Sequence, residues 1–310
     1  MADFFKRLFH KRTPAEASLN PEIQPVVKIG DRRNTVPIEP QEYPSPQVKP
    51  HLDVPQLLVG VAQSIGIQRD HNEDSLYTLT TNLLVDERSI NFGLYIIADG
   101  MGGHDNGELA SRLAVDRLVS HVINTLYLLL ISASNSTHEF SLQEVMQAGV
   151  LKAHEAIKKA TDGGGTTLTA ALFLGDQCTI SHVGDSRAYY ADPLGNIKLI
   201  TRDHTLVKRL QEIGQISSYE ALTHPQRNVL YRALGQGEPF EPDISSFQVC
   251  PGCQLLICSD GLWGVIPEED LAQVLCSAMD PKLACQTLVN RANQAGGPDN
   301  VSVIIVRLSE

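Results

Sequence analysis

The sequence lacks any excess of positive charge. Its 25 Lys and Arg residues are outnumbered by 36 Asp and Glu residues, which gives a formal net charge of −11 at pH 7. A surface that binds the phosphates of a nucleic acid usually carries a basic excess. We therefore expect no nucleic-acid partner. The acidic excess has another use, because clustered carboxylates are ligands for hard divalent cations.

Cysteine is also sparse, with six residues in a chain of 310, and most of them lie in apolar runs. This number does not make the dense disulfide framework of a small secreted domain, so a reducing compartment is expected. One C-x-x-C occurs, from Cys250 to Cys253, with Pro-Gly between the cysteines. We interpret it as a turn between two strands in which the cysteines are small apolar residues. A redox pair or a zinc site is the alternative.

Long apolar runs are absent as well. The longest, residues 126–131, is far shorter than the roughly 20 residues that span a membrane. The first twelve residues lack the apolar core and small-residue cleavage site of a secretory signal. We therefore expect a cytoplasmic protein.

Residues 1–55 differ in composition from the rest of the chain. Nine prolines fall between residues 13 and 55, and no helical or strand period is sustained there. Such a segment buries too little apolar surface to offset its ordering entropy, so we predict a disordered tail. Within residues 1–12, large apolar side chains lie on one helical face and basic ones opposite. This pattern suits a weak contact with a membrane surface or a partner, and equally a frayed terminus.

Residues 56–310 have the pattern of one globular domain. Strands and amphipathic helices alternate in runs and pairs, and tight turns at Gly175–Asp176 and Gly184–Asp185 indicate antiparallel hairpins. We predict an α+β fold in which two packed antiparallel sheets are flanked by helix pairs. The expected elements are strands at 57–65 and 92–98, helices at 108–132 and 141–160, strands at 167–174, 179–183 and 187–190, a helix at 204–213, a strand pair within 248–258, helices at 267–278 and 281–294, and a strand at 301–308.

Acidic residues stand at the ends of these strands. Apolar runs of strand length lead directly into Asp99–Gly100 and Asp260–Gly261, while Glu73–Asp74 and Asp299 each precede a strand. One Asp-Gly alone is often a plain turn. Several carboxylates gathered in a partly buried pocket repel one another unless cations neutralise them. Hard oxygen ligands of this kind favour Mg²⁺ or Mn²⁺.

Arg69 adds a hint about the substrate. It precedes Glu73 and Asp74 by four and five residues, and we expect it on the same β-edge. A guanidinium beside a metal cluster suits the oxygens of a phosphate monoester, although a single arginine is more often a surface ion-pair residue.

Taken together, the motifs resemble the metal-dependent protein phosphatases of type 2C, in their bacterial form. Six blocks match in order and spacing across residues 57–308, and the segment 204–235 resembles the flap subdomain of the bacterial branch. The blocks are Arg69-x-x-Asn72-Glu73-Asp74, Asp99-Gly100-Met101-Gly102-Gly103-His104, Gly165-Thr166-Thr167, Gly184-Asp185-Ser186-Arg187, Ser259-Asp260-Gly261-Leu262-Trp263 and Asp299-Asn300.

The resemblance implies two bound divalent cations, Mn²⁺ or Mg²⁺. Asp99 would bridge both, and Asp260 with Asp299 would hold the first. Asp74 and the carbonyl of Gly100 would complete the second.

Two further acidic residues are candidate ligands by the same resemblance. Glu73 is an alternative to Asp74 at the second cation. Asp162, in a loop of its own, would form a third and looser site with Asp260.

The reaction implied by the resemblance is hydrolysis of phosphoserine and phosphothreonine in proteins by a hydroxide that bridges the metals. Arg69 would hold the phosphoryl oxygens, and Asp99 would act through the metals. The general acid is unassigned, because Met101 stands where eukaryotic relatives have His. Asp185 and Arg187 are interpreted as a structural hairpin with a buried ion pair, and Trp263 as core packing.

The expected partners are phosphorylated proteins, the substrates of a serine/threonine kinase, and the expected state is a monomer. Two alternatives stay open. One is a catalytically silent regulator that binds phosphoproteins, which would be expected to have lost metal ligands. The other is a phosphatase of small phosphate esters.

Overall fold

Residues 55–85, 88–102, 104–132, 141–278 and 280–310 are described in a computed structural model of the chain. Apart from Pro55, the predicted tail and the contact proposed for residues 1–12 lie outside this part.

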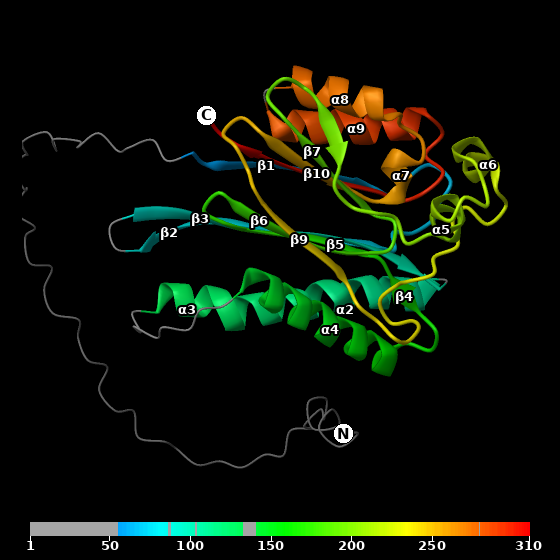
Figure 1. Ribbon diagram of the computed structural model, residues 1–310, viewed down its shortest axis with the longest axis horizontal. Helices are drawn as coiled ribbons and strands as arrows, with labels where there is room; N and C mark the ends of the chain where they lie inside the picture. The colour runs from blue at the N-terminus through cyan, green and yellow to red at the C-terminus, as the bar shows by residue number, and fades with distance from the viewer. Residues whose placement is uncertain (1–54, 86–87, 103, 133–140, 279) are drawn as a thin grey trace, which may run out of the picture. The chain divides into compact units, whose positions relative to one another are not determined.

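Two antiparallel sheets stack face to face at the centre of the domain (Figure 1). The first contains, in order, β1 (Leu57–Ser64), β11 (Val301–Leu308), β10 (Gln254–Cys258), β7 (Arg187–Ala191) and β8 (Ile197–Leu199). The second contains β2 (Asp74–Val85), β3 (Arg88–Met101), β5 (Leu168–Leu174), β6 (Gln177–Val183) and β9 (Asp243–Gln248), with β4 (Gly165–Thr166) paired to β3. The predicted sandwich is confirmed.

Helix pairs cover the outer face of each sheet (Figure 1). On the second sheet lie α2 (His104–Val122), which continues through a π-helical turn, η1 (Ile123–Tyr127), into α3 (Leu128–Ile131), and α4 (Leu142–Ala160). On the first sheet lie α8 (Glu268–Ser277) and α9 (Pro281–Gln294). The helix at 106–131 is long and apolar enough to cross a membrane by length and composition. Its residues Ala114 and Leu118 are fully buried in the core beneath the second sheet.

Strand periodicity decides which side chains lie between the sheets. In β3, Ile96 and Ala98 pack towards the helices, whereas Tyr95 and Ile97 pack into the core between the sheets. Because successive strand residues alternate faces, Asp99 continues the series that points between the sheets. Asp99, close to the end of β3, therefore aims its carboxylate into the end of the sandwich.

The segment around Gly184 corrects the predicted hairpin. Strand β6 pairs with β5 and β9, whereas β7 pairs with β10 and β8, so the chain crosses here from one sheet to the other. Gly184 has a φ of 104°, and a Cβ there would lie 2.7 Å from the Cβ of Thr167. Only glycine tolerates this combination of backbone and space. The turn at Gly175 is a hairpin, as predicted.

The region around 248–258 is also corrected. The first strand of the predicted pair is β9, which ends at Gln248, and it pairs with β6 in the other sheet rather than with β10. The Pro-Gly turn is present, but its flanking cysteines, Cys250 and Cys253, are joined by a disulfide. The prediction that they are merely small apolar residues is wrong.

The segment at 204–235 projects from one end of the sandwich and carries two short helices, α5 (Leu206–Glu212) and α6 (Ser218–Thr223) (Figure 1). We call this segment the flap. Its first residue, His204, is fixed to the crossover: the backbone N–H of Gly184 donates to His204 Nδ1 at 3.1 Å. Its last turn is fixed by two backbone hydrogen bonds between Leu234 and Thr166. The flap is therefore attached beside β4, at the end of the sandwich where Asp99 lies.

The buried His182 beneath the flap predicts acid sensitivity of the fold. Its Nε2 donates to the carbonyl of Arg202 at 3.0 Å, and its Nδ1 lies 2.9 Å from the Thr169 hydroxyl oxygen. Burial, and secondly the neighbouring His204, lower the pKa of His182 from 6.5 to about 4. A lowered pKa means that the unfolded chain takes up the proton first. The contribution of neutral His182 to the free energy of unfolding is therefore complete above pH 6.5 and is lost as the pH falls to 4.

We expect His182→Gln to remove part of this pH dependence. The difference in free energy of unfolding between wild type and variant should shrink by about 3 kcal/mol between pH 7 and pH 4. Urea denaturation at both pH values measures it. His224→Gln, in the flap, is the control. An unchanged difference between wild type and His182→Gln would contradict the assignment.

Candidate functional site

Two carboxylates face each other across neighbouring strands at the end of the sandwich. Asp74 begins β2 and lies directly opposite Asp99 of β3 in the antiparallel register. Asp74 shares its face with Leu76, which packs between the sheets, so both carboxylates point to the same side. Residues in this register have Cβ atoms about 5 Å apart, and like charges there are destabilising.

The other sheet adds two more carboxylates. Asp260 opens the short helix α7 (Asp260–Trp263) directly after β10, and Asp299 lies two residues before β11. Both strands are interior strands of the first sheet. Because they are antiparallel neighbours, β10 ends where β11 begins, at the same end of the sheet. The aspartates predicted from the sequence are therefore brought together by the ends of both sheets.

Burial and mutual repulsion perturb the titration of these groups. Burial, and then the charges of Asp260 and Asp299, raise the pKa of Asp74 to about 7. Burial and the charge of Asp299 raise the pKa of Asp260 to about 6. The pKa of Asp99 is raised well above its ordinary range by burial and by the charge of Asp74. The site therefore holds more negative charge than its surroundings stabilise.

The donor set fits divalent cations. Asp74 accepts one hydrogen bond from the Ser302 hydroxyl at 2.7 Å on Oδ2, while its buried Oδ1 has no hydrogen-bond partner. A buried carboxylate oxygen without a partner is costly, and a hard cation satisfies it. In the described part of the chain, no three His, Cys, Asp or Glu side chains already stand in a closed metal-binding arrangement. A cation would have to draw these carboxylates together.

Arg69 neutralises one member of the cluster. Its Nη2 lies 2.7 Å from Asp299 Oδ2, and its side chain is 49% exposed. This hydrogen bond is the main cause that raises the pKa of Arg69. Arg69 was expected on a β-edge, but it lies in the loop between β1 and β2. The loop brings it to Asp299 rather than alongside Asp74.

Two other predicted site residues have different surroundings. The Glu73 carboxylate pairs with His71 Nε2 at 2.8 Å, while its backbone carbonyl accepts from the N–H of Gly100 at 3.2 Å. Asp162 is exposed in the loop after α4, where its backbone carbonyl accepts from Asn106. Neither of these carboxylates is among the main causes of the raised pKa of Asp74 or Asp99.

Polar residues without a predicted role hold the carboxylates in place. The hydroxyl of Thr167 accepts from the N–H of Asp99 at 3.0 Å, and that of Thr166 donates to the carbonyl of Asp99 at 2.9 Å. Asn300 donates to the carbonyls of Ile65 and His71 at 2.8 and 3.0 Å. Its Oδ1 also accepts from the N–H of Glu73 at 2.8 Å. Ser302 could have been found from the sequence, because it alternates with apolar residues in a buried strand.

A second correction concerns Arg187. It pairs bidentately with Asp203 at 3.0 and 2.7 Å, not with Asp185. Its guanidinium lies 3.6 Å from the ring centre of Trp263, whose Nε1 donates to the carbonyl of Asp185 at 2.9 Å. Trp263 is only partly buried and forms a wall of the site instead of pure core packing.

A cavity of about 560 Å³ lies between the flap and the carboxylates. Asp260 and Asp299 line it, together with flap residues such as Lys208 and Leu222. The site is thus open to a group larger than phosphate alone.

We expect Asp74→Asn to stabilise the metal-free protein. A raised pKa means that stability is lost as the pH rises towards 7, and the neutral amide avoids this loss. In the presence of a chelator, the gain should be negligible near pH 4 and reach about 2–4 kcal/mol above pH 7. Thermal or urea unfolding measures it, with the exposed Asp176→Asn as the matched control. Destabilisation at pH 8 would argue against a strained, repulsive cluster.

Comparisons with known proteins agree with this geometry. Residues 71–294 match the family described as "Protein phosphatase 2C". The serine/threonine phosphatase Stp of Listeria monocytogenes is 37% identical over 243 residues, which cover 78% of this chain and 92% of that protein. The solved structure of the Mycobacterium tuberculosis phosphatase PstP/Ppp has a TM-score of 0.67 at 32% identity, and the match covers 82% of this chain and 99% of that one.

A further structure contains metal. The catalytic domain of the serine/threonine phosphatase PstP, in complex with two manganese ions, matches with a TM-score of 0.65 at 30% identity. That match covers 82% of this chain and 99% of that one. The resemblance noted in the sequence is confirmed: the chain belongs to the metal-dependent protein phosphatase 2C family.

Proposed function

We propose that this protein phosphatase removes phosphate from phosphoserine and phosphothreonine in proteins with the help of two divalent cations, Mn²⁺ or Mg²⁺. The observation that carries the proposal is the convergence of aspartates from both sheets on one partly buried site that holds an excess of negative charge. The candidate ligands are Asp74, Asp99, the carbonyl of Gly100, Asp260 and Asp299.

Asp74 is favoured over Glu73 as a ligand. Asp74 lies on the face of β2 that points between the sheets and has a free carboxylate oxygen, whereas Glu73 is engaged by His71. Asp162 is the candidate for a third, looser site with Asp260, and its exposure suits a cation that exchanges readily. When bound, cations of this kind supply an activated water for attack on a phosphoryl group.

The residues of the chain have two further tasks in this proposal. The hydroxyls of Thr166 and Thr167 fix the backbone of Asp99, so that its carboxylate is held ready on a rigid strand. Arg69 forms an ion pair with Asp299. If Asp299 held a cation, the half-exposed guanidinium of Arg69 would be free to hold the oxygens of the substrate phosphate.

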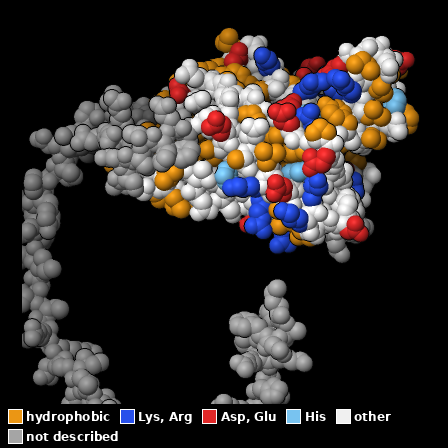
Figure 2. Space-filling model, turned by 60° about the horizontal axis from the view of Figure 1, so that its bottom comes forward, with side chains coloured by type: hydrophobic (Ala, Val, Ile, Leu, Met, Phe, Trp, Pro, Cys, Tyr) orange, Lys and Arg blue, Asp and Glu red, His pale blue; other side chains and the backbone are white. Residues whose placement is uncertain are grey.

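Protein substrates are favoured over small esters by the surface around the site. The flap exposes large apolar side chains, which also appear on the lobe at the right of Figure 2. They are Ile213, Tyr219, Leu222, Val229 and Tyr231. A small ester would leave both this surface and the cavity beneath the flap unused. We propose that the protein reverses the phosphorylation made by a serine/threonine kinase. We also propose that it acts in the cytoplasm and as a monomer.

Retention of the full carboxylate set weighs against a silent binding module. Cation dependence tests the proposal. Turnover of p-nitrophenyl phosphate and of a phosphothreonine peptide should require Mn²⁺ or Mg²⁺, and Asp260→Asn should lower kcat by at least about 100-fold. Asp176→Asn is the control. Turnover without metal, or full activity in Asp260→Asn, would contradict the proposal. Peptide turnover no better than ester turnover would favour the small-ester alternative.

Arg69→Ala should weaken substrate binding more than it affects chemistry. We expect KM for a phosphopeptide to rise about tenfold, because a charge-assisted contact to phosphate is lost. Arg69→Lys keeps the charge but lacks the planar guanidinium that can donate two hydrogen bonds to phosphate, so it should recover only part of this loss. Steady-state kinetics at saturating Mn²⁺ separate KM from kcat. An unchanged KM in Arg69→Ala would remove Arg69 from the phosphate site.

A further inference from the structure

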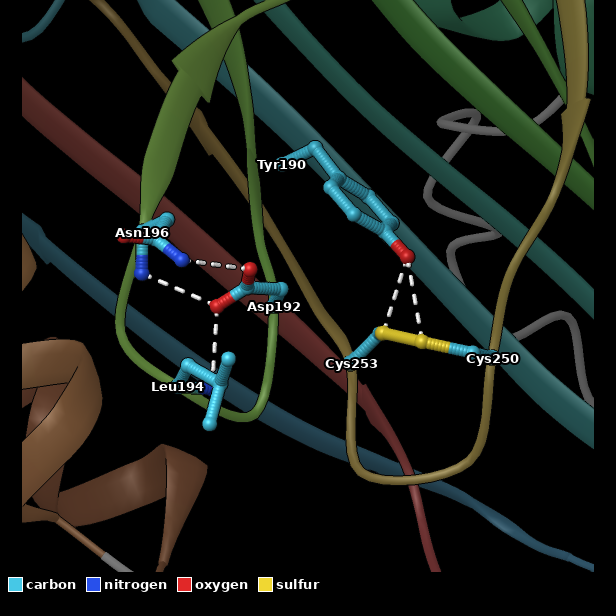
Figure 3. The surroundings of a disulfide bond; sticks show 6 residues. All are labelled: Tyr190, Asp192, Leu194, Asn196, Cys250 and Cys253. Atoms are coloured by element: carbon cyan, nitrogen blue, oxygen red, sulfur yellow. Dashed lines mark hydrogen bonds between the residues drawn. A yellow bond between two sulfur atoms is a disulfide. The ribbon is translucent and has the colours of Figure 1, made fainter.

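The disulfide between Cys250 and Cys253 lies at the end of β10 remote from Asp260, where the chain turns between β9 and β10 (Figure 3). The turn itself brings the cysteines together. The N–H of Cys253 donates to the carbonyl of Cys250 at 3.0 Å, with Pro251 next and Gly252 at a φ of 78°. Pro followed by a left-handed Gly is the pattern of a type II turn. The Cα atoms are 5.4 Å apart, within the range that a disulfide spans.

Backbone hydrogen bonds hold this turn in place independently of the disulfide. The N–H of Gly252 donates to the carbonyl of Leu308 at 2.8 Å, and the N–H of Leu308 donates to the carbonyl of Cys253 at 3.1 Å. Both bonds tie the turn to the end of β11. The two thiols of the reduced form therefore stay within reach of each other, and the bond can open and close without refolding.

The two sulfurs differ in access. Cys250 is exposed, whereas Cys253 is fully buried in the core between the sheets. An attacking thiol can therefore reach Cys250 but not Cys253. Among the other cysteines, Cys178, Cys258 and Cys285 are buried and only Cys276 is exposed. The pair thus has the arrangement of an outer exchanging sulfur and an inner leaving sulfur.

Tyr190 of β7 supplies a donor to the inner sulfur. Its hydroxyl donates to Cys253 Sγ at 2.8 Å and lies 3.2 Å from Cys250 Sγ (Figure 3). A buried thiolate is a poor leaving group without a hydrogen bond, since burial disfavours its charge. The Tyr190 hydroxyl stands where that charge develops. Its ring packs edge-on against Phe247 at 5.7 Å, so its position does not depend on the sulfurs.

We propose that Cys250 and Cys253 form a reversible thiol–disulfide exchange site for an external dithiol, in which the Tyr190 hydroxyl donates a hydrogen bond to the leaving sulfur. A thiolate of the dithiol attacks Cys250 Sγ, the Cys250–Cys253 bond breaks, and the electron pair passes to Cys253 Sγ, which then takes a proton from water. The second thiol of the reductant attacks the mixed disulfide and releases Cys250 as a thiol. Two electrons and two protons pass to the protein, and the reductant becomes a disulfide.

The test equilibrates the folded full chain with dithiothreitol at set ratios of reduced to oxidised form. After acid quenching, free thiols are alkylated with N-ethylmaleimide under denaturing conditions, and each cysteine is followed by mass spectrometry. Cys250 and Cys253 should gain and lose label together as one two-electron couple. The four other cysteines should stay labelled throughout and serve as the internal control. In Cys250→Ser, Cys253 should stay labelled at every ratio.

Tyr190→Phe tests the hydroxyl while keeping the ring. Reduction of the pair by dithiothreitol should be about tenfold slower than in wild type, and Tyr219→Phe on the flap should leave the rate unchanged. The exchange site is overturned if the pair never oxidises, if it resists reduction until the chain is unfolded, or if Cys253 loses label in Cys250→Ser. An unchanged rate in Tyr190→Phe removes Tyr190 from the proposal.

Discussion

Repulsion between partly buried carboxylates is the constraint around which one end of this molecule is built. Asp74 and Asp99 face each other in register on the buried side of an antiparallel pair, where like charges are unfavourable. Asp260 and Asp299 add charge from the opposite sheet, and the raised pKa values of Asp74 and Asp260 follow from burial and this crowding. A fold that keeps such an arrangement needs a counter-charge, which divalent cations supply and which Arg69 provides in part.

The rest of the fold gives this cluster a rigid frame. Strand alternation aims Asp99 between the sheets, and the backbone of Asp99 is held by the hydroxyls of Thr166 and Thr167. Asn300 ties the loop that carries Arg69 to β11 through three hydrogen bonds. The flap starts at the crossover beside Gly184 and closes over a cavity at the same end. The parts that would touch substrate therefore lie on loops, and the parts that would touch metal lie at strand ends.

The sequence predicted those features that depend on local pattern. The succession of strand patterns and paired amphipathic helices predicted the sandwich. The apolar strands that run into Asp99 and Asp260 predicted that acidic side chains gather at strand ends. Features that depend on long-range pairing were missed or wrong. Nothing local indicates that Gly184 carries the chain to another sheet, that Arg187 selects Asp203, or that Arg69 reaches Asp299. The Cys250–Cys253 bond also depends on a turn geometry that the motif alone does not fix.

Proton release on metal binding is the most direct measure of this crowding of carboxylates. If crowding holds protons on the cluster near neutral pH, Mn²⁺ must displace them as it binds. Calorimetric titration with Mn²⁺ at pH 6.5, in buffers of different ionisation enthalpy, measures the number released. The account predicts a release of about one proton or more per chain, which falls as the pH is raised to 8. Mn²⁺ binding without proton release at pH 6.5 would contradict it.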